Sequence, residues 1–153
     1  MAKCWTVRRQ SDGPGPGATF LVGTGEWGRD GAWPRPWPPP FTTLAWRMSH
    51  LSEMLWMRAD HTVGTHSTTQ DTYRISGTAQ EAMAALDAGL AAWREALVSA
   101  TDEDLDLVGR STYPNGSDPE DRFLETVWWV NQEVLHHGAE VALLRDLYRD
   151  RQS

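Results

Sequence analysis

Histidine and glutamate side chains in two separate segments have the types and spacing that could bind a metal ion. One histidine, His50, lies in the first third of the 153-residue sequence, and two adjacent histidines, His136 and His137, lie near its end. Glu133 precedes His137 by four residues, a spacing that places both side chains on one face of a helix. Imidazole and carboxylate groups from two helices that face one bundle interior are a workable start for a divalent-metal site.

A His/Glu/His set with open coordination positions suits zinc, nickel or iron, with manganese as a further candidate. Such an ion would acidify a bound water or thiol. The same spacing also fits an interpretation without metal, in which each histidine is partly buried on an amphipathic helix and hydrogen-bonded to the protein. The apolar pattern favours His137 over His136 as the inward-facing ligand, but this segment is apolar nearly all round, so both stay candidates.

Other common chemistries have no matching motif in this sequence. Glycines in residues 13–17 alternate with prolines and precede no helical pattern, so they do not resemble a phosphate-binding loop. No Ser/His/Asp nucleophile motif is visible. The single cysteine, Cys4, excludes both an intrachain disulfide framework and a cysteine-rich zinc site. Metal binding through histidine and carboxylate is therefore the candidate that remains.

Three long helices must position these residues, and all are predicted after residue 40. The first is expected over about 42–61, from apolar residues at spacings of three and four. The second begins at a capping box, Thr78–Glu81, and should end near residue 100. The third opens with an Asp-Pro pair at residues 118–119 and continues to about residue 149. The apolar face of the second helix is expected to comprise Met83, Leu86, Leu90, Trp93 and Leu97.

Residues 1–40 differ in composition from the rest of the chain, with seven glycines, seven prolines and four tryptophans. Glycine and proline interrupt regular structure, so no long helix is expected there. Two short runs, residues 4–7 and 19–22, could pair as small strands. The sequence therefore predicts an all-α fold with an irregular N-terminal arm (residues 1–40) and a helical bundle domain (residues 41–150).

Charge and hydropathy exclude several classes of protein. The net charge of −7 argues against nucleic-acid binding, because phosphates require a basic surface. No stretch approaches 18 apolar residues, so no membrane association through a spanning helix is expected. The first ten residues lack the apolar core of a signal peptide, and the single cysteine is typical of a reducing compartment. These features predict a cytoplasmic protein.

Two segments resemble the DinB-like superfamily. Residues 38–51 read Pro-Pro-Pro-Phe-Thr-Thr-Leu-Ala-Trp-Arg-Met-Ser-His-Leu, and residues 131–148 contain His-His-Gly-Ala-Glu, a motif similar to that of one bacterial branch. The resemblance covers about Cys4 to Tyr148 and implies a four-helix bundle. It also implies a divalent metal, which many members bind through one histidine on an early helix and two, four apart, on the last helix. Some relatives are transferases or isomerases that use low-molecular-weight thiols such as mycothiol or bacillithiol.

The resemblance transfers only in part to the ligand positions. His50 matches the first histidine of the family. Direct alignment of the last helix places His136 on the last ligand and Gln132 on the one before it, and glutamine is a poor ligand for these metals. A shift of one residue gives Glu133 and His137 instead. The metal site is therefore expected to be either altered or lost.

A full helix precedes the segment matching Cys4 in this branch of the family, whereas only three residues precede it here. We expect a second copy of the chain, in a homodimer, or the tryptophan-rich arm to fill that place. Two functions follow. One is a metal-dependent thiol S-transferase, in which the thiolate of a low-molecular-weight thiol attacks an electrophilic substrate. The other is a non-catalytic binding or dimerisation module with a degenerate metal site, which binds a small-molecule ligand or none.

Overall fold

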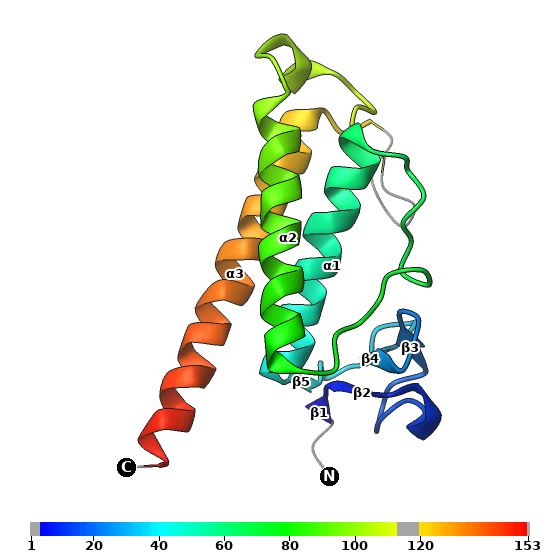
Figure 1. The fold of residues 1–153 in the computed structure, drawn as a ribbon, viewed down its shortest axis with the longest axis vertical. Helices are drawn as coiled ribbons and strands as arrows, with labels where there is room; N and C mark the ends of the chain where they lie inside the picture. The colour runs from blue at the N-terminus through cyan, green and yellow to red at the C-terminus, as the bar shows by residue number, and fades with distance from the viewer. Residues whose placement is uncertain (1–3, 113–119, 153) are drawn as a thin grey trace.

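The computed structural model describes residues 4–112 and 120–152 of the chain. The main body consists of three long helices, α1 (Leu44–Val63), α2 (Ala79–Val98) and α3 (Phe123–Asp150). α1 and α2 run in the same direction, because the connection between them returns along the bundle, and α3 runs the opposite way (Figure 1). Two short 3-10 helices flank this body, η1 (Gln10–Asp12) and η2 (Glu103–Asp106).

Side-chain caps define where the first two helices begin. The Thr43 hydroxyl accepts a hydrogen bond from the backbone N–H of Trp46 at 3.2 Å. Thr78 and Glu81 form the predicted capping box at the start of α2. The predictions of these two helices are confirmed, with each end within two residues of its expected place.

The third helix begins later than predicted. Its first residue is Phe123, with Arg122 in the N-cap position, and residues 120–122 are not helical. The backbone N–H of Phe123 donates to the Leu107 carbonyl oxygen at 3.0 Å, and Arg122 forms an antiparallel bridge with Val108. This pairing with the segment after η2 holds the chain extended where the Asp-Pro signal indicated a helix. Residues 118 and 119 themselves lie outside the described residues.

The N-terminal segment forms two small sheets, so the all-α prediction is confirmed only for the helical body and not for this part of the chain. Its strands are β1 (Cys4–Trp5), β2 (Val7–Arg9), β3 (Phe20–Val22), β4 (Trp27–Gly31) and β5 (Phe41–Thr42). β4 lies between β2 and β3 in an antiparallel sheet, and β1 pairs with β5 in parallel. The predicted run 19–22 contains β3, whereas the run 4–7 is divided between β1 and the first residue of β2. The two runs do not pair with each other.

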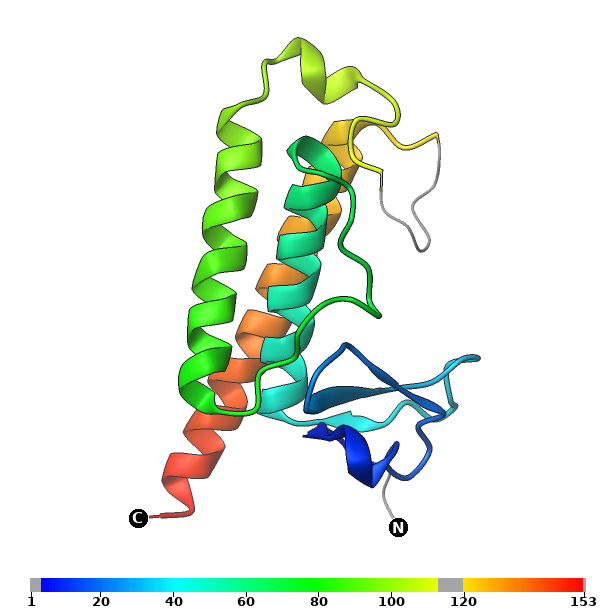
Figure 2. The ribbon, with the colours of Figure 1, turned by 45° about the vertical axis from the view of Figure 1, so that its right-hand side comes forward.

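The two sheets lie beside the start of α1, as the rotated view shows (Figure 2). Strand β4 makes the closest polar connection to this helix. The Trp46 indole N–H donates to the backbone oxygen of Asp30 at 2.9 Å, and Arg29 forms a buried ion pair with Glu53. The N-terminal segment is thereby attached to the same helix that carries His50.

The core lies where the three helices meet. It comprises Leu51, Met54, Leu55, Ala59, Trp93, Ala96, Phe123 and Val130. The expected apolar face of α2 is only partly correct, because Met83 and Leu90 are exposed while Gly89 is buried against α1. Gly89 allows α1 to approach closely, and Met83 and Leu90 lie on the outer face, whereas Trp93 packs in the core. None of the helices in residues 4–112 and 120–152 is both long and apolar enough to cross a membrane.

Two glycines make a matched test of this helix packing. A Cβ at Gly89 would lie 3.0 Å from the Ser52 carbonyl oxygen and 3.2 Å from the Leu55 Cβ, whereas a Cβ at Gly138 would meet no described atom within 4 Å. Gly89→Ala is therefore expected to lower the free energy of unfolding by about 1–3 kcal/mol. Gly138→Ala should raise it by up to about 1 kcal/mol, because alanine favours the helix. Urea denaturation of both variants measures this, and equal effects would contradict the close contact of α1 with α2.

Candidate metal centre

The candidate site lies on the seam where α1 and α3 pack antiparallel. Leu51 and Met54 of α1 and Val130 of α3 belong to the buried core that holds this seam together. His50 therefore faces α3 beside a fixed apolar contact, opposite the helical turn that carries Glu133 and His137. The antiparallel packing brings together residues that are more than 80 positions apart in the sequence.

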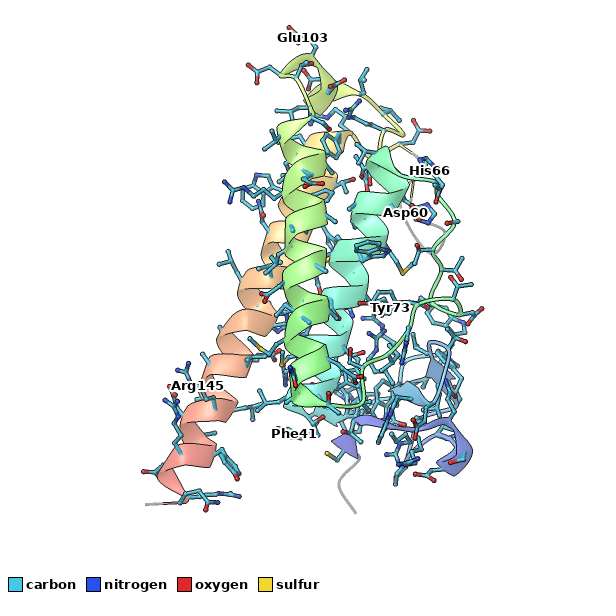
Figure 3. The ribbon with its side chains drawn as sticks, in the orientation of Figure 1. Phe41, Asp60, His66, Tyr73, Glu103 and Arg145 are labelled. Carbon is cyan, nitrogen blue, oxygen red and sulfur yellow. The ribbon has the colours of Figure 1, made fainter. Side chains whose placement is uncertain are left out.

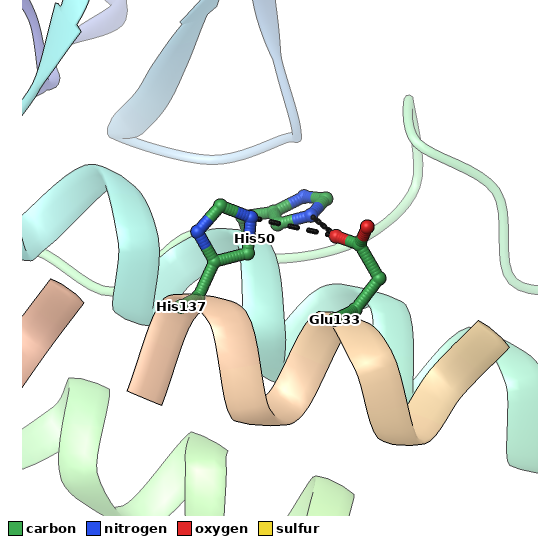
Figure 4. Close-up of side chains that lie close together, drawn as sticks. All are labelled: His50, Glu133 and His137. Atoms are coloured by element: carbon green, nitrogen blue, oxygen red, sulfur yellow. Dashed lines mark hydrogen bonds and ion pairs between the residues drawn. The ribbon is translucent and has the colours of Figure 1, made fainter. Parts of the chain in front are cut away.

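Three side chains converge at this point (Figure 4). The Nε2 atom of His50 lies 3.1 Å from Oε2 of Glu133, and Nε2 of His137 lies 3.4 Å from the same oxygen. The three ligand atoms all lie within 4.8 Å of one another. Each residue is partly or largely buried, with 23% of the His50 and Glu133 side chains and 11% of the His137 side chain exposed.

Glu140, one helical turn after His137, makes a second group of contacts. Its Oε2 lies 2.7 Å from Nδ1 of His137 and also forms an ion pair with Nη1 of Arg47 on α1. Its Oε1 lies 3.3 Å from Nε2 of His136. The His136 side chain is 61% exposed, so this residue lies at the rim of the site.

Trp46 forms one wall of the site. Its ring stacks on the His50 imidazole with centroids 5.2 Å apart, and it meets His137 edge-on at 6.2 Å. The indole is fixed from behind by its hydrogen bond to the Asp30 carbonyl oxygen, and the Arg29 guanidinium lies over it at 5.3 Å. Strand β4 therefore determines the position of an aromatic ring that contacts both imidazoles.

The surroundings of these groups favour metal-binding protonation states. Burial lowers the pKa of His50 to about 4, and the hydrogen bond to Glu133 opposes this shift only in part. Contacts with the His137 and His50 imidazoles hold the pKa of Glu133 well below its usual range, despite partial burial. At neutral pH, His50 is thus a neutral imidazole and Glu133 a carboxylate, which are the forms that bind metals.

The geometry fits a divalent ion with three protein ligands. Metal–ligand distances of about 2.1 Å in a tetrahedral zinc site place neighbouring ligand atoms about 3.4 Å apart. The two distances to Glu133 Oε2, 3.1 and 3.4 Å, match this spacing. Two imidazoles and one carboxylate leave a fourth position for water or substrate, as in catalytic zinc sites.

Comparison with protein families adds independent evidence. The profile of the DinB superfamily matches residues 26–141, or 116 of the 153 residues. The chain belongs to the DinB superfamily. The matched region includes the converging residues of α1 and α3 and ends just after Glu140. No significant match was found among curated proteins or among solved structures.

Within this DinB chain, the structure brings together three of the four sequence-predicted ligands. His50, Glu133 and His137 form one group, whereas His136 belongs to a second group with His137 and Glu140. Gln132, which direct alignment places at a ligand position, is exposed. Of the two alignments that the sequence left open, the one shifted by a residue therefore places its side chains opposite His50.

Three residues of the DinB site received no role from the sequence alone. Glu140 had a usable signal, because it follows His137 by three residues and so shares its helical face. Arg47 and Trp46 lie within the segment of family resemblance, but their partners come from α3 and β4, which no local pattern reveals. Asp60 and His66 lie toward the opposite end of α1 from Phe41, away from this site (Figure 3).

The pH dependence of stability provides a test of the His50 environment. In metal-free protein, the free energy of unfolding should fall as the pH drops from about 6.5 to about 4. In this range His50 is protonated in the unfolded chain but stays neutral in the folded protein. The shift of His50 corresponds to about 3 kcal/mol in total. Denaturant unfolding with chelator present measures it. His50→Gln should flatten the dependence and His136→Gln should not; an unchanged slope in His50→Gln would contradict the shift.

Proposed function

We propose that this DinB-superfamily protein binds one divalent metal ion through His50, Glu133 and His137 and acts as a low-molecular-weight-thiol S-transferase. The observation that carries the proposal is the convergence of two imidazole nitrogens on one carboxylate oxygen at metal-site spacing. Zinc, nickel, iron and manganese all accept such a donor set. A bound ion would lower the pKa of a coordinated thiol, so that its sulfur attacks an electrophilic substrate as a thiolate.

The side chains of this protein would hold the metal ion in place and shield it from water. His50 and His137 present nitrogen atoms from two helices, and the Trp46 ring covers the site on one side and limits the access of water. Farther along the α1–α3 seam lies an open groove of about 560 Å³, lined among others by Leu44, Leu144 and Tyr148. Its apolar walls are suited to the organic part of a small-molecule ligand.

Metal content provides the first test. Untagged protein purified without chelators is expected to carry close to one zinc, nickel, iron or manganese ion per chain by elemental analysis. His137→Ala should abolish binding, and the matched variant His136→Ala should retain it, since these neighbours differ in their contact with Glu133. Wild-type protein that stays metal-free after loading with each ion, or equal loss in both variants, would refute the proposed site.

Thiol transfer provides the second test. Metal-loaded protein is expected to convert a haloarene only when mycothiol or bacillithiol is present, with one thiol consumed and one halide ion and one proton released for each thioether formed. The metal-free protein and His137→Ala are the matched controls. Metal binding without thiol consumption in any of these mixtures would leave a metal site but refute the transferase assignment.

A second candidate function is a non-catalytic binding or dimerisation module. One observation favours it: apolar side chains on the outer faces of α2 and α3 are exposed, among them Met83, Leu90, Val98, Leu135 and Leu143. Exposed apolar surface of this kind is typical of contact sites for other protein chains. Sedimentation analysis would show a concentration-dependent homodimer if a second copy covers these faces, and a monomer at all concentrations would exclude the role as a dimerisation module.

A further inference from the structure

The Glu140 carboxylate contacts three side chains that can donate hydrogen bonds. Its Oε2 atom forms an ion pair with the Arg47 guanidinium and also lies 2.7 Å from Nδ1 of His137. Its Oε1 atom lies 3.3 Å from Nε2 of His136. An ionised carboxylate can only accept hydrogen bonds. The short contact therefore requires that Nδ1 of His137 carry a proton.

The protonation of Nδ1 determines what the other side of the ring can do. In a neutral imidazole only one nitrogen carries the proton, so Nε2 of His137 presents its lone pair. That lone pair points toward Glu133 Oε2 at 3.4 Å, where two electron-rich atoms face one another. A cation between them satisfies both, which is the arrangement of carboxylate–histidine–metal triads.

Arg47 fixes the carboxylate in this role. Its side chain is 10% exposed, its Nε donates to the Thr42 carbonyl oxygen at 3.3 Å, and its Nη1 contacts Glu140. The guanidinium cannot lose its proton at ordinary pH, so it keeps Glu140 ionised and oriented from α1. It also places a positive charge beside the second possible ligand group, His136, His137 and Glu140, and this charge disfavours a second metal ion there.

We infer that Glu140, held by Arg47, is a positioning residue that fixes the tautomer and ring orientation of His137 so that Nε2 faces the metal position. The inference rests on the proposed metal site for its effect on affinity, but the tautomer of His137 is a property of the metal-free protein. The two ideas can therefore fail separately.

Two measurements test the inference together. In the metal-free wild type, nitrogen-15 NMR correlations of the imidazole rings should show His137 protonated at Nδ1, and Glu140→Ala should shift its population toward the Nε2–H tautomer. Zinc affinity, measured by competition with a chromophoric chelator, should fall about 10- to 100-fold in Glu140→Ala. Arg47→Met should produce a smaller loss, and Arg47→Lys should recover part of it because the cation is restored.

The matched control is Asp146→Asn, which removes one negative charge from an exposed position on the same helix. It should alter neither the tautomer nor the zinc affinity. An unchanged His137 tautomer in Glu140→Ala would overturn the inference. So would a zinc affinity of Glu140→Ala equal to that of a zinc-binding wild type. So would two ions per chain that become one in His136→Ala. A wild type that binds no zinc but shows the Nδ1–H tautomer would refute the proposed function and leave the positioning contact standing.

Discussion

Arg29→Met is expected to lower the free energy of unfolding by about 3–5 kcal/mol, the largest effect on stability predicted here. Arg29 and Glu53 form an ion pair in which the two side chains are only 4% and 2% exposed. Removal of the guanidinium leaves the Glu53 carboxylate buried without its counter-charge. Urea denaturation at neutral pH measures the loss.

The pH dependence of this loss has a definite sign. Burial raises the pKa of Glu53, and Arg29 opposes that shift, so the pKa should rise further in Arg29→Met. A protonated Glu53 is tolerated in the folded state, so the variant should lose stability progressively as the pH rises above the unfolded pKa of about 4.5. A destabilisation that is equal at low and neutral pH would contradict this account.

The matched control is Arg9→Met, the same substitution in the neighbouring strand β2. Arg9 pairs with Glu26 at the surface, where the two side chains are 55% and 60% exposed. Surface pairs of this kind contribute at most about 1 kcal/mol. If Arg9→Met costs as much as Arg29→Met, burial is not the cause of the effect.

The helices of this fold could be predicted because their signals are local. Thr78 and Glu81 are three residues apart, so the whole capping box lies within one short stretch of sequence. The start of α3 depends instead on pairing of Phe123 with Leu107 across a loop, and this contact overrides the nearby Asp-Pro signal. Local patterns therefore indicated where helices lie but not where tertiary contacts shorten them.

Strand β4 shows why the N-terminal sheets could not be predicted in full. Its sequence, Trp-Gly-Arg-Asp-Gly, has a low β-propensity, yet it is the central strand of three. Its position depends on partners elsewhere: the Phe20 ring lies against Gly31 where a Cβ would collide, and Arg8 holds the Asp30 carboxylate. Such non-local contacts determine the position of this strand, and the local sequence pattern does not predict them.

The candidate site was predictable to a similar extent. The i, i+4 spacing of Glu133 and His137 is local, but their alignment opposite His50 depends on the antiparallel packing of α3 on α1. Since α3 is apolar nearly all round, its sequence could not decide between His136 and His137. The decision comes from the register set by core contacts such as Val130, which turns His137 inward and leaves His136 at the rim.

Asp30→Asn is expected to lower the free energy of unfolding by about 3 kcal/mol and to weaken metal binding at a distance. The Asp30 side chain is fully buried and accepts four hydrogen bonds, two from Arg8 and one each from the backbone N–H groups of Thr6 and Gly15, at 2.8–3.0 Å. An asparagine amide turns one acceptor into a donor that faces these donors. Because the Asp30 backbone oxygen also holds the Trp46 indole, a loosened β4 should disturb the wall of the site.

Stability and zinc affinity should therefore fall together in this variant, measured by urea denaturation and by chelator competition. Asp12→Asn is the matched control, since Asp12 is exposed and its side chain accepts a hydrogen bond at 3.3 Å from the hydroxyl of the adjacent Ser11. Trp46→Phe separates the two effects, because it keeps an aromatic ring beside His50 but removes the N–H donor to Asp30. If Asp30→Asn is destabilised while zinc affinity is unchanged, the strand supports the fold alone. If Trp46→Phe reproduces the loss of affinity with little loss of stability, the single hydrogen bond from Trp46 to β4 couples the N-terminal sheet to the metal centre.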